Sequence, residues 1–346
     1  MNGISSSFSE SLLSWFKRYG RDLPWRQTRD PYLIWLSEII LQQTRVEQGR
    51  DYWLRFVERW PSVEQLAAAT EDEVLRQWQG LGYYSRARNL LYAARQVVEL
   101  GGFPQTVEGL RKLKGVGDYT AAAIASFAFD VPAAVVDGNV YRVLARYWGI
   151  ETPIDSTEGR RLFALLAQEL LPPEQAADFN QAIMDFGAIQ CTPANPACLV
   201  CPLVESCLAC REQKVASLPV KAGKTRVQER RLLYIYIRYR GMVAIRRRGA
   251  GDFWQGLWEL AERESLELKG ESLKLLAKDM LHVLSHRRLL CDFYLWEVNE
   301  KPALPAGYIW VREEELDGYA KPRLIERLLE LVPRATTSPS ASPYRQ

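Results

Sequence analysis

Residues 113–146 read LKGVGDYTAAAIASFAFDVPAAVVDGNVYRVLAR, and the rest of the chain is organised around this stretch. Its glycine pair, Gly115 and Gly117, predicts a tight turn, and the apolar run over residues 120–129 predicts the helix that follows. Amide groups in such a turn, next to a helix N-terminus, bind phosphate without reading a base sequence. The plainer alternative is a helix–turn–helix in which Asp137 only caps a second helix. The glycine pair alone is a weak indication of nucleic-acid binding.

Length and composition limit the classes to which the protein can belong. Its 346 residues are long for one core, so two or three domains are expected. Hydrophobic residues make up 47% and charged residues 25%, as in soluble globular proteins. The net charge is only +3, so contact with DNA requires a local basic face. No run is apolar enough to span a bilayer, and MNGISSSFSE lacks the features of an export signal, which predicts a cytoplasmic protein without membrane contact.

One acidic residue, Glu38, lies inside the apolar segment PYLIWLSEIILQQTRVEQ, which predicts a single helix over residues 31–48. Ile34 and Leu41 fall on the same helical face as Glu38. Burying a charged carboxylate among such neighbours is costly, so two interpretations are open. Glu38 is either paired in a salt bridge, or it is a carboxyl whose pKa is raised by burial, as a general acid requires.

Two loops carry aromatic and basic residues that suit contact with a nucleic acid. The segment RDLPWR places Trp25 between Arg21 and Arg26, although a surface loop with one buried tryptophan has the same composition. The segment GLGYYSRAR places Leu81 and Tyr83 beside glycines and arginines. Tyrosines in such a loop stack on bases or wedge between them, or they simply pack in a core.

Four of the six cysteines have the spacing C-x6-C-x2-C-x5-C, at Cys191, Cys198, Cys201 and Cys207. Clustered thiols in a reducing compartment more often hold a metal than form disulfides. Four thiolates suit either a zinc ion or a [4Fe–4S] cluster, and ligand type alone does not separate the two. Cys210 falls outside the spacing and is expected to be a spectator.

The chain changes character after residue 211. A basic, polar connector is predicted over residues 212–229 and an α+β module over residues 230–334. The predicted strands cover residues 232–239, 242–247, 289–298 and 307–311, and a helix is predicted over residues 323–331. The tail, residues 335–346, has the composition of a disordered segment. His282 and His286 have a spacing that could bring both to one metal, but no further ligand accompanies them.

Together these motifs resemble the adenine DNA glycosylases (MutY type) of the helix-hairpin-helix DNA glycosylase superfamily. The resemblance rests on SEIILQQT, GLGYYSRARNL, LKGVGDYTA with Asp137, the cysteine spacing, and a C-terminal module similar to MutT-like domains. It implies an all-α helix-hairpin-helix glycosylase with an iron–sulfur cluster loop, joined to a C-terminal α+β MutT-like (Nudix-fold) domain. The implied catalytic region is residues 1–211, with a six-helix part at about 27–134 and a cluster part made of the N-terminal helix and residues 135–211. Residues 230–334 would recognise the lesion.

The resemblance implies a monofunctional enzyme of base excision repair. Relatives that also cut the DNA backbone carry a lysine where Tyr119 stands, and tyrosine cannot form their Schiff base. The implied reaction removes adenine mispaired with 8-oxoguanine or G in duplex DNA, by base flipping and acid-assisted hydrolysis of the N-glycosidic bond. Glu38 would donate the proton and Asp137 would stabilise the sugar cation, with Tyr119 and Asn139 orienting these groups.

The same resemblance assigns the binding residues. DNA and the flipped base would be contacted by Arg21, Trp25, Arg26, Gln43, Leu81, Tyr83, Gly115, Gly117, Gln181, Ser285 and His286. A [4Fe–4S] cluster would be held by Cys191, Cys198, Cys201 and Cys207, and the protein would act as a monomer. Leu284 replaces a phenylalanine of the family, and the module lacks the Nudix box that binds Mg²⁺, so it is expected to recognise DNA without hydrolysing a pyrophosphate.

Two other functions stay open. A thymine glycosylase acting on T·G mispairs resembles the same hairpin, although the MutT-like module argues against it. A DNA-binding iron–sulfur protein without enzymatic activity, such as a redox sensor, would not need both Glu38 and Asp137.

Overall fold

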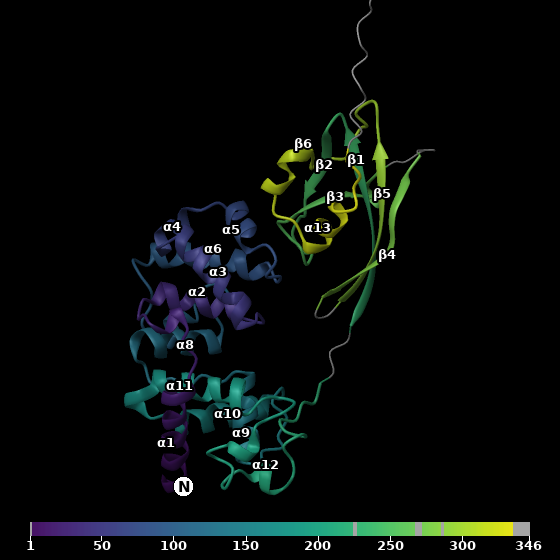
Figure 1. The fold of residues 1–346 in the computed structure, drawn as a ribbon. Helices are drawn as coiled ribbons and strands as arrows, with labels where there is room; N and C mark the ends of the chain where they lie inside the picture. Colours follow the sequence, from purple (N-terminus) through teal and green to yellow (C-terminus); the bar gives the residue numbers. More distant parts are fainter. Residues whose placement is uncertain (1, 224–226, 267–271, 285–286, 335–346) are drawn as a thin grey trace, which may run out of the picture. The chain divides into compact units, whose positions relative to one another are not determined.

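The structure is a computed structural model that describes residues 2–223, 227–266, 272–284 and 287–334 (Figure 1). Its contacts divide the chain into two compact units, residues 1–69 with 89–224 and residues 70–88 with 225–346. None of the helices in the described ranges is long and apolar enough to cross a bilayer. A helical part precedes a mixed sheet, as the sequence predicts.

Six of the α-helices in the described ranges begin after a residue whose side chain caps the first turn. The capping side chains, each accepting a hydrogen bond from an amide two or three residues later, are those of Asp30, Ser62, Thr70, Thr106, Asp137 and Ser156. The helices are α1 (Asn2–Tyr19), α2 (Pro31–Leu41), α3 (Val46–Arg59), α4 (Val63–Ala68), α5 (Glu71–Trp78), α6 (Ser85–Glu99), α7 (Val107–Leu110), α8 (Asp118–Phe129), α9 (Gly138–Tyr147), α10 (Thr157–Leu170), α11 (Ala176–Asp185) and α12 (Leu208–Arg211). A short helical turn, η1 (Pro24–Arg26), precedes α2.

The prediction of one helix over residues 31–48 is wrong. The structure divides this segment into α2 and α3, which are separated by residues 42–45. Gln43 has a φ of 57°, in the left-handed region, where a right-handed helix cannot continue. Gln42 Nε2 instead donates to Oγ1 of Thr120, on α8, over 3.2 Å. The helix therefore breaks where Gln42 contacts a residue distant in sequence. Residues 42–45 contain no glycine or proline from which the break could be predicted.

The N-terminal helix shares its core with residues far along the chain. Phe8, Leu12 and Trp15 of α1 are buried in one cluster with side chains of α9, α10 and α11. In Figure 1, α1 lies beside α11, which it contacts. A second cluster joins α2 to α8. The chain therefore enters the same core at its start and again after residue 140.

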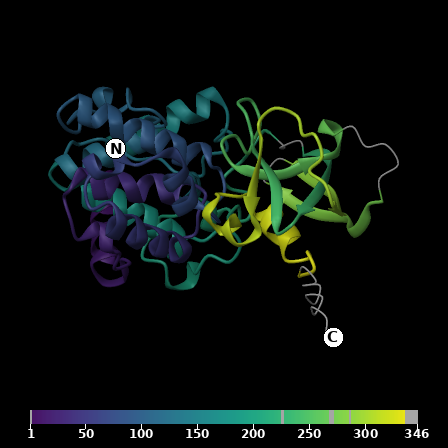
Figure 2. The ribbon, with the colours of Figure 1, turned by 90° about the horizontal axis from the view of Figure 1, so that it is seen from above.

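The C-terminal unit is built on a mixed sheet. Its strands in the described residues are β1 (Gln228–Tyr239), β2 (Met242–Arg247), β3 (Trp258–Glu262), β4 (Lys274–Leu284), β5 (Arg287–Glu297) and β6 (Tyr308–Arg312), in the order β4-β5-β1-β3-β2-β6. β1 runs parallel to β5, and the other neighbours are antiparallel. Figures 1 and 2 show the strands of this unit, in green and yellow, from two directions. Residues 234–237 of β1 are buried on both faces of the sheet. Helix α13 (Arg323–Leu329) buries its own apolar face.

Most of the predicted elements of this unit are confirmed. Arg240 and Gly241 both have positive φ, as a two-residue turn between the antiparallel strands β1 and β2 requires. The strands predicted over residues 289–298 and 307–311 correspond to β5 and β6, and the predicted helix to α13. β3 and β4 were not predicted from the sequence, and β4 is a half-exposed strand without regular alternation.

Candidate active site

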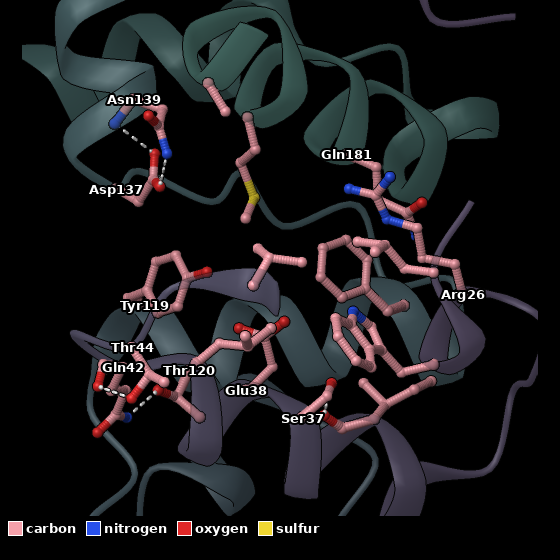
Figure 3. A pocket seen from close by; sticks show the side chains of 18 of the residues that line it. Arg26, Ser37, Glu38, Gln42, Thr44, Tyr119, Thr120, Asp137, Asn139 and Gln181 are labelled. Atoms are coloured by element: carbon pink, nitrogen blue, oxygen red, sulfur yellow. Dashed lines mark hydrogen bonds between the residues drawn. The ribbon is translucent and has the colours of Figure 1, made fainter. Parts of the chain in front are cut away.

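A cavity of about 930 Å³ lies inside the helical unit (Figure 3). Its walls come from the loop around η1, from α2, from the turn before α8, from the start of α9 and from α11. Of the residues singled out by sequence, it brings together Arg21, Trp25, Arg26, Glu38, Gln43, Gly115, Gly117, Tyr119, Asp137, Asn139 and Gln181. This volume lies within the range of small-molecule pockets.

Glu38 is the buried acid of the cavity. Its place in the middle of α2 leaves it 7% exposed. Burial raises the pKa of Glu38 to about 7; a hydrogen bond from Tyr119 and the charge of Arg26 act to lower it, and the charge of Asp137 acts to raise it. Arg26 is itself ion-paired with Asp185, with 2.8 Å between Nη1 and Oδ2. Glu38 is therefore partly protonated at neutral pH, which suits a general acid.

Tyr119 lies on α8 and faces the same cavity. Burial raises the pKa of its phenol well above the usual value, and the charges of Glu38 and Asp137 raise it further. Tyr119 therefore remains a neutral donor that holds the carboxyl of Glu38.

Asp137 caps α9, and this fixes its orientation. Its Oδ1 accepts the amides of Asn139 and Val140, each over 2.8 Å, and its Oδ2 accepts Asn139 Nδ2 over 2.7 Å (Figure 3). Burial raises the pKa of Asp137, whereas these hydrogen bonds favour its charged form. Asn139 is held in turn by Arg142, whose Nη2 donates to its Oδ1 over 2.8 Å.

Trp25, Arg26 and Gln181 form a second group of lining residues. Trp25 is buried and meets Trp53 edge to face, with 5.8 Å between ring centroids. Arg26 and Gln181 both line the cavity (Figure 3), and Gln181 lies one helical turn before Asp185, the ion-pair partner of Arg26, on α11. The group therefore offers an aromatic ring together with hydrogen-bonding side chains.

Gly115 and Gly117 form the turn before α8. Gly115 has a φ of 78°, and a Cβ there would lie 2.8 Å from the side chain of Asn89, so both conformation and space require glycine. Gly117 is the N-cap of α8 and has open surroundings. The first amides of α8 have no intrahelical partners, which suits an anion.

Two residues expected to contact DNA, Gln43 and Tyr83, share an uncommon backbone conformation. Gln43 has a φ of 57° and Tyr83 a φ of 46°. Such left-handed conformations cost of order 1–3 kcal/mol and persist where the surroundings hold them. Tyr83 is 40% exposed, whereas Leu81 is only 8% exposed.

The four clustered cysteines converge. Arg146 of α9 donates from Nη1 to Cys191 Sγ over 3.4 Å. Burial raises the pKa of Cys201 to about 11, and the thiols of Cys191, Cys207 and Cys198 each act to raise it further. Within the described part of the chain, no group of three or more His, Cys, Asp or Glu side chains meets the geometry of a single-ion site. The donor set itself, four thiols beside an arginine, fits a thiolate-ligated cluster.

Ser285 and His286 lie outside the described residues. His282 lies on β4, where burial lowers its pKa and its ring meets Trp254 at 6.0 Å.

Two family models match consecutive segments of the chain. The model described as "HhH-GPD superfamily base excision DNA repair protein" matches residues 36–169, and the "NUDIX domain" model matches residues 233–331. The adenine DNA glycosylase of Buchnera aphidicola subsp. Schizaphis graminum (strain Sg) is 32% identical over 290 residues, which cover 83% of each chain. The chain belongs to the adenine DNA glycosylase family.

Other similarities agree with this family. The adenine DNA glycosylase of Mus musculus is 45% identical over 235 residues, 65% of this chain and 46% of that protein, so the chain spans about half the length of this relative. A thermostable thymine-DNA glycosylase structure is 32% identical, with a TM-score of 0.57, and covers 61% of this chain and 98% of its own. A structure of a non-covalent endonuclease III–DNA complex shares the fold at 23% identity and a TM-score of 0.53, covering 62% and 98%. The predicted helix-hairpin-helix part and Nudix-fold domain are confirmed.

Two residues that shape this cavity, Asn180 and Gly187, were not predicted from the sequence. Asn180 accepts the amide of Val135 over 3.0 Å and so holds the segment that leads to Asp137. A Cβ at Gly187 would lie 2.6 Å from Cβ of Asn139, so glycine makes room for that side chain. Each acts on a residue distant in sequence, and no local pattern marks it.

Proposed function

We propose that the protein is a monofunctional DNA glycosylase that excises adenine opposite 8-oxoguanine or G in duplex DNA. The observation that carries this proposal is one cavity holding Glu38, with a pKa of about 7, and Asp137, fixed as a carboxylate acceptor at a helix N-terminus. Acid-assisted cleavage of a glycosidic bond needs two carboxyl groups in different protonation states. Membership of the adenine DNA glycosylase family supports adenine as the base.

In the proposed reaction, adenine leaves the helical stack at a cost of a few kcal/mol and enters the cavity. Neutral Glu38 donates its proton to adenine N7, because the adenine anion is a poor leaving group. Positive charge develops on the sugar as the bond from N9 to C1′ breaks, and ionised Asp137 stabilises it. Glu38, now a carboxylate, takes a proton from the water that adds to C1′, which yields free adenine and an abasic site.

The second group of lining residues suits recognition of the base. The carboxamide oxygen of Gln181 would accept from the N6 amino group of adenine, and Arg26 would donate to the neighbouring N1. Trp25 would form part of the wall beside the ring. Guanine carries an oxygen and an N–H at the corresponding positions, so the same pair would disfavour it.

The remaining proposed roles concern DNA and the cysteine loop. Backbone phosphate would bind the turn at Gly115 and Gly117, while Gln43 and Tyr83 would occupy the space left by the flipped base. Cys191, Cys198, Cys201 and Cys207 would hold a [4Fe–4S] cluster, whose bound iron would cross-link the loop. Residues 230–334 would recognise 8-oxoguanine through Ser285 and His286, with the protein acting as a monomer.

Duplexes that differ only in the mispair test this function. The protein should make A·8-oxoG and A·G duplexes labile to alkali and should leave T·G and A·T duplexes intact. Because Tyr119 cannot form a Schiff base, borohydride should trap little protein on DNA. Release of thymine from T·G would favour the thymine glycosylase alternative, and cleavage without alkali at the rate of base release would contradict a monofunctional enzyme.

A further inference from the structure

Asp185 is a buried carboxylate to which the mechanism above gives no part. It ends α11, and its side chain is 0% exposed. Its Oδ1 and Oδ2 accept Nη2 and Nη1 of Arg26, both over 2.8 Å, and the carboxylate also accepts the backbone amide and the guanidinium of Arg21. Burial opposes the charge, but these hydrogen bonds keep the pKa of Asp185 below its usual value. Both arginines line the cavity.

Arg26 keeps part of its donor capacity after these contacts. A guanidinium has five N–H groups. Asp185 takes two of them, and the backbone oxygen of Arg21 takes a third over 2.9 Å. The group also lies over the ring of Phe16, 5.5 Å from its centroid. One N–H on Nη2 and the N–H on Nε have no partner recorded among the described residues, and the contacts that hold the group fix the direction of both.

We propose that Asp185 is a positioning residue for base recognition, which fixes the guanidinium of Arg26 beside Gln181 so that the cavity prefers a base with a ring-nitrogen acceptor next to an amino group. This inference rests on the proposed function. Gln181 lies one turn before Asp185, so a single helix positions both members of the pair (Figure 3). In adenine these two groups are N1 and N6.

Asp185 also limits the positive charge that faces Glu38. Arg21 and Arg26 together with Asp185 carry a net charge of about +1, and neutralising Asp185 would raise it to about +2. The groups that act on Glu38 are Tyr119 on α8, Asp137 at the start of α9, and Arg26 in η1, whose charge already lowers the pKa of Glu38. Loss of Asp185 should therefore make Glu38 give up its proton at a lower pH.

The test is single-turnover excision by full-length Asp185→Asn, with adenine or 1-deazaadenine placed opposite 8-oxoguanine. The analogue lacks the N1 acceptor but keeps N6 and N7. Any difference in the intrinsic reactivity of the two bases cancels when two proteins are compared. The adenine-to-analogue rate ratio should be roughly 10-fold smaller in the variant than in the wild type, as expected for losing a hydrogen bond from a charged donor. As the pH is raised, the excision rate of the variant should also begin to fall at a lower pH than the wild-type rate does.

Glu259→Gln is the matched control. Glu259 is also fully buried between two arginines, Arg246 and Arg248, but it lies in the C-terminal unit. It should keep the wild-type ratio and pH profile. If Asp185→Asn does not give the circular dichroism of a folded protein, Arg26→Lys is tested in its place. Lysine keeps the positive charge but lacks the planar guanidinium, which can bond Asp185 and the base at the same time.

Three outcomes separate the hypotheses. A wild-type ratio in Asp185→Asn, or in Arg26→Lys where that variant replaces it, overturns the positioning role. An equal change of ratio in Glu259→Gln also overturns it, since the effect would then be general destabilisation. A wild-type protein that releases no adenine instead refutes the proposed function itself.

Discussion

At Glu38, burial raises the pKa of a carboxyl from 4.5 to about 7. The folded protein thus binds this proton more tightly than the unfolded chain does. The contribution of Glu38 to the free energy of unfolding is therefore fully present below pH 4.5 and is lost as the pH rises through about 7. The difference between the two pKa values corresponds to about 3 kcal/mol.

Glu38→Gln should separate catalysis from stability. The amide cannot donate the proton, so adenine release should slow by roughly 10²- to 10⁴-fold. At pH 8 the variant should exceed the wild type in free energy of unfolding by up to about 3 kcal/mol, and near pH 4 the difference should vanish. Urea titrations at the two pH values measure this, with the exposed Glu47→Gln as control. Equal pH dependence in wild type and Glu38→Gln would show that the pKa is not raised.

The sequence could identify Glu38 but not Asp185, and the reason is physical. An acid inside an apolar helix is out of place, so Glu38 stands out within its own segment. Asp185 lies in DFNQAIMDFG, where an acidic residue at a helix end is ordinary, and its partner Arg21 is 164 residues away. Arg21 and Arg26 in one short loop were the available indication that a buried carboxylate was needed.

At the scale of elements, the packing of α3 against α2 shows where the sequence pattern fails to predict a helix boundary. A Cβ at Gly49 would lie 2.6 Å from the side chain of Leu41, so the two helices meet at this glycine. Residues 42–48 read QQTRVEQ and contain no glycine or proline, so the local sequence does not mark a break that involves a tertiary contact. The glycine turn before α8 was predictable, because the positive φ of Gly115 is a local requirement that glycine itself marks in the sequence.

The cysteine loop gives a prediction at the same scale. Cys198→Ser should lose iron, sulfide and DNA affinity together, since one ligand of the proposed cluster is gone. Cys210 forms a hydrogen bond with Cys198, and Cys210→Ser keeps a side chain able to do so, so it should retain all three. Metal analysis and absorbance near roughly 400 nm on anaerobically prepared protein measure the cluster. Stoichiometric zinc without iron would contradict the proposal.

At the scale of the whole molecule, hydrogen bonds and burial attach the chain to the helical unit as far as Gly223. Asp155 accepts the amides of Ala222 and Gly223, each over 2.9 Å, and Leu218 is buried in the core that contains α1. All groups proposed for chemistry precede this point. A chain cut after Gly223 therefore keeps the cavity and its acid.

This truncated chain should still excise adenine but should lose preference for 8-oxoguanine over G opposite it. One or two lost hydrogen bonds to the lesion, at about 1 kcal/mol each, correspond to a loss of roughly 5- to 30-fold. The double variant Ser285→Ala with His286→Ala should reproduce most of this loss in the full chain. Single-turnover rates on A·8-oxoG and A·G duplexes measure it. An unchanged ratio in both proteins would place lesion recognition outside the C-terminal domain.

The sharing of one core by α1 and residues beyond 140 has a consequence for synthesis. α1 leaves the ribosome before α9, α10 and α11, and the side chains that cover Phe8, Leu12 and Trp15 belong largely to these helices, which are made more than a hundred residues later. At about 5–20 residues per second, the wait before residue 185 appears is on the order of ten seconds. During this time the apolar face of α1 is open to chaperones or to mispairing, and Arg21 and Arg26 have no counter-charge. The part of the cavity around Arg26 and Gln181 is thus among the last features of the nascent helical unit to form.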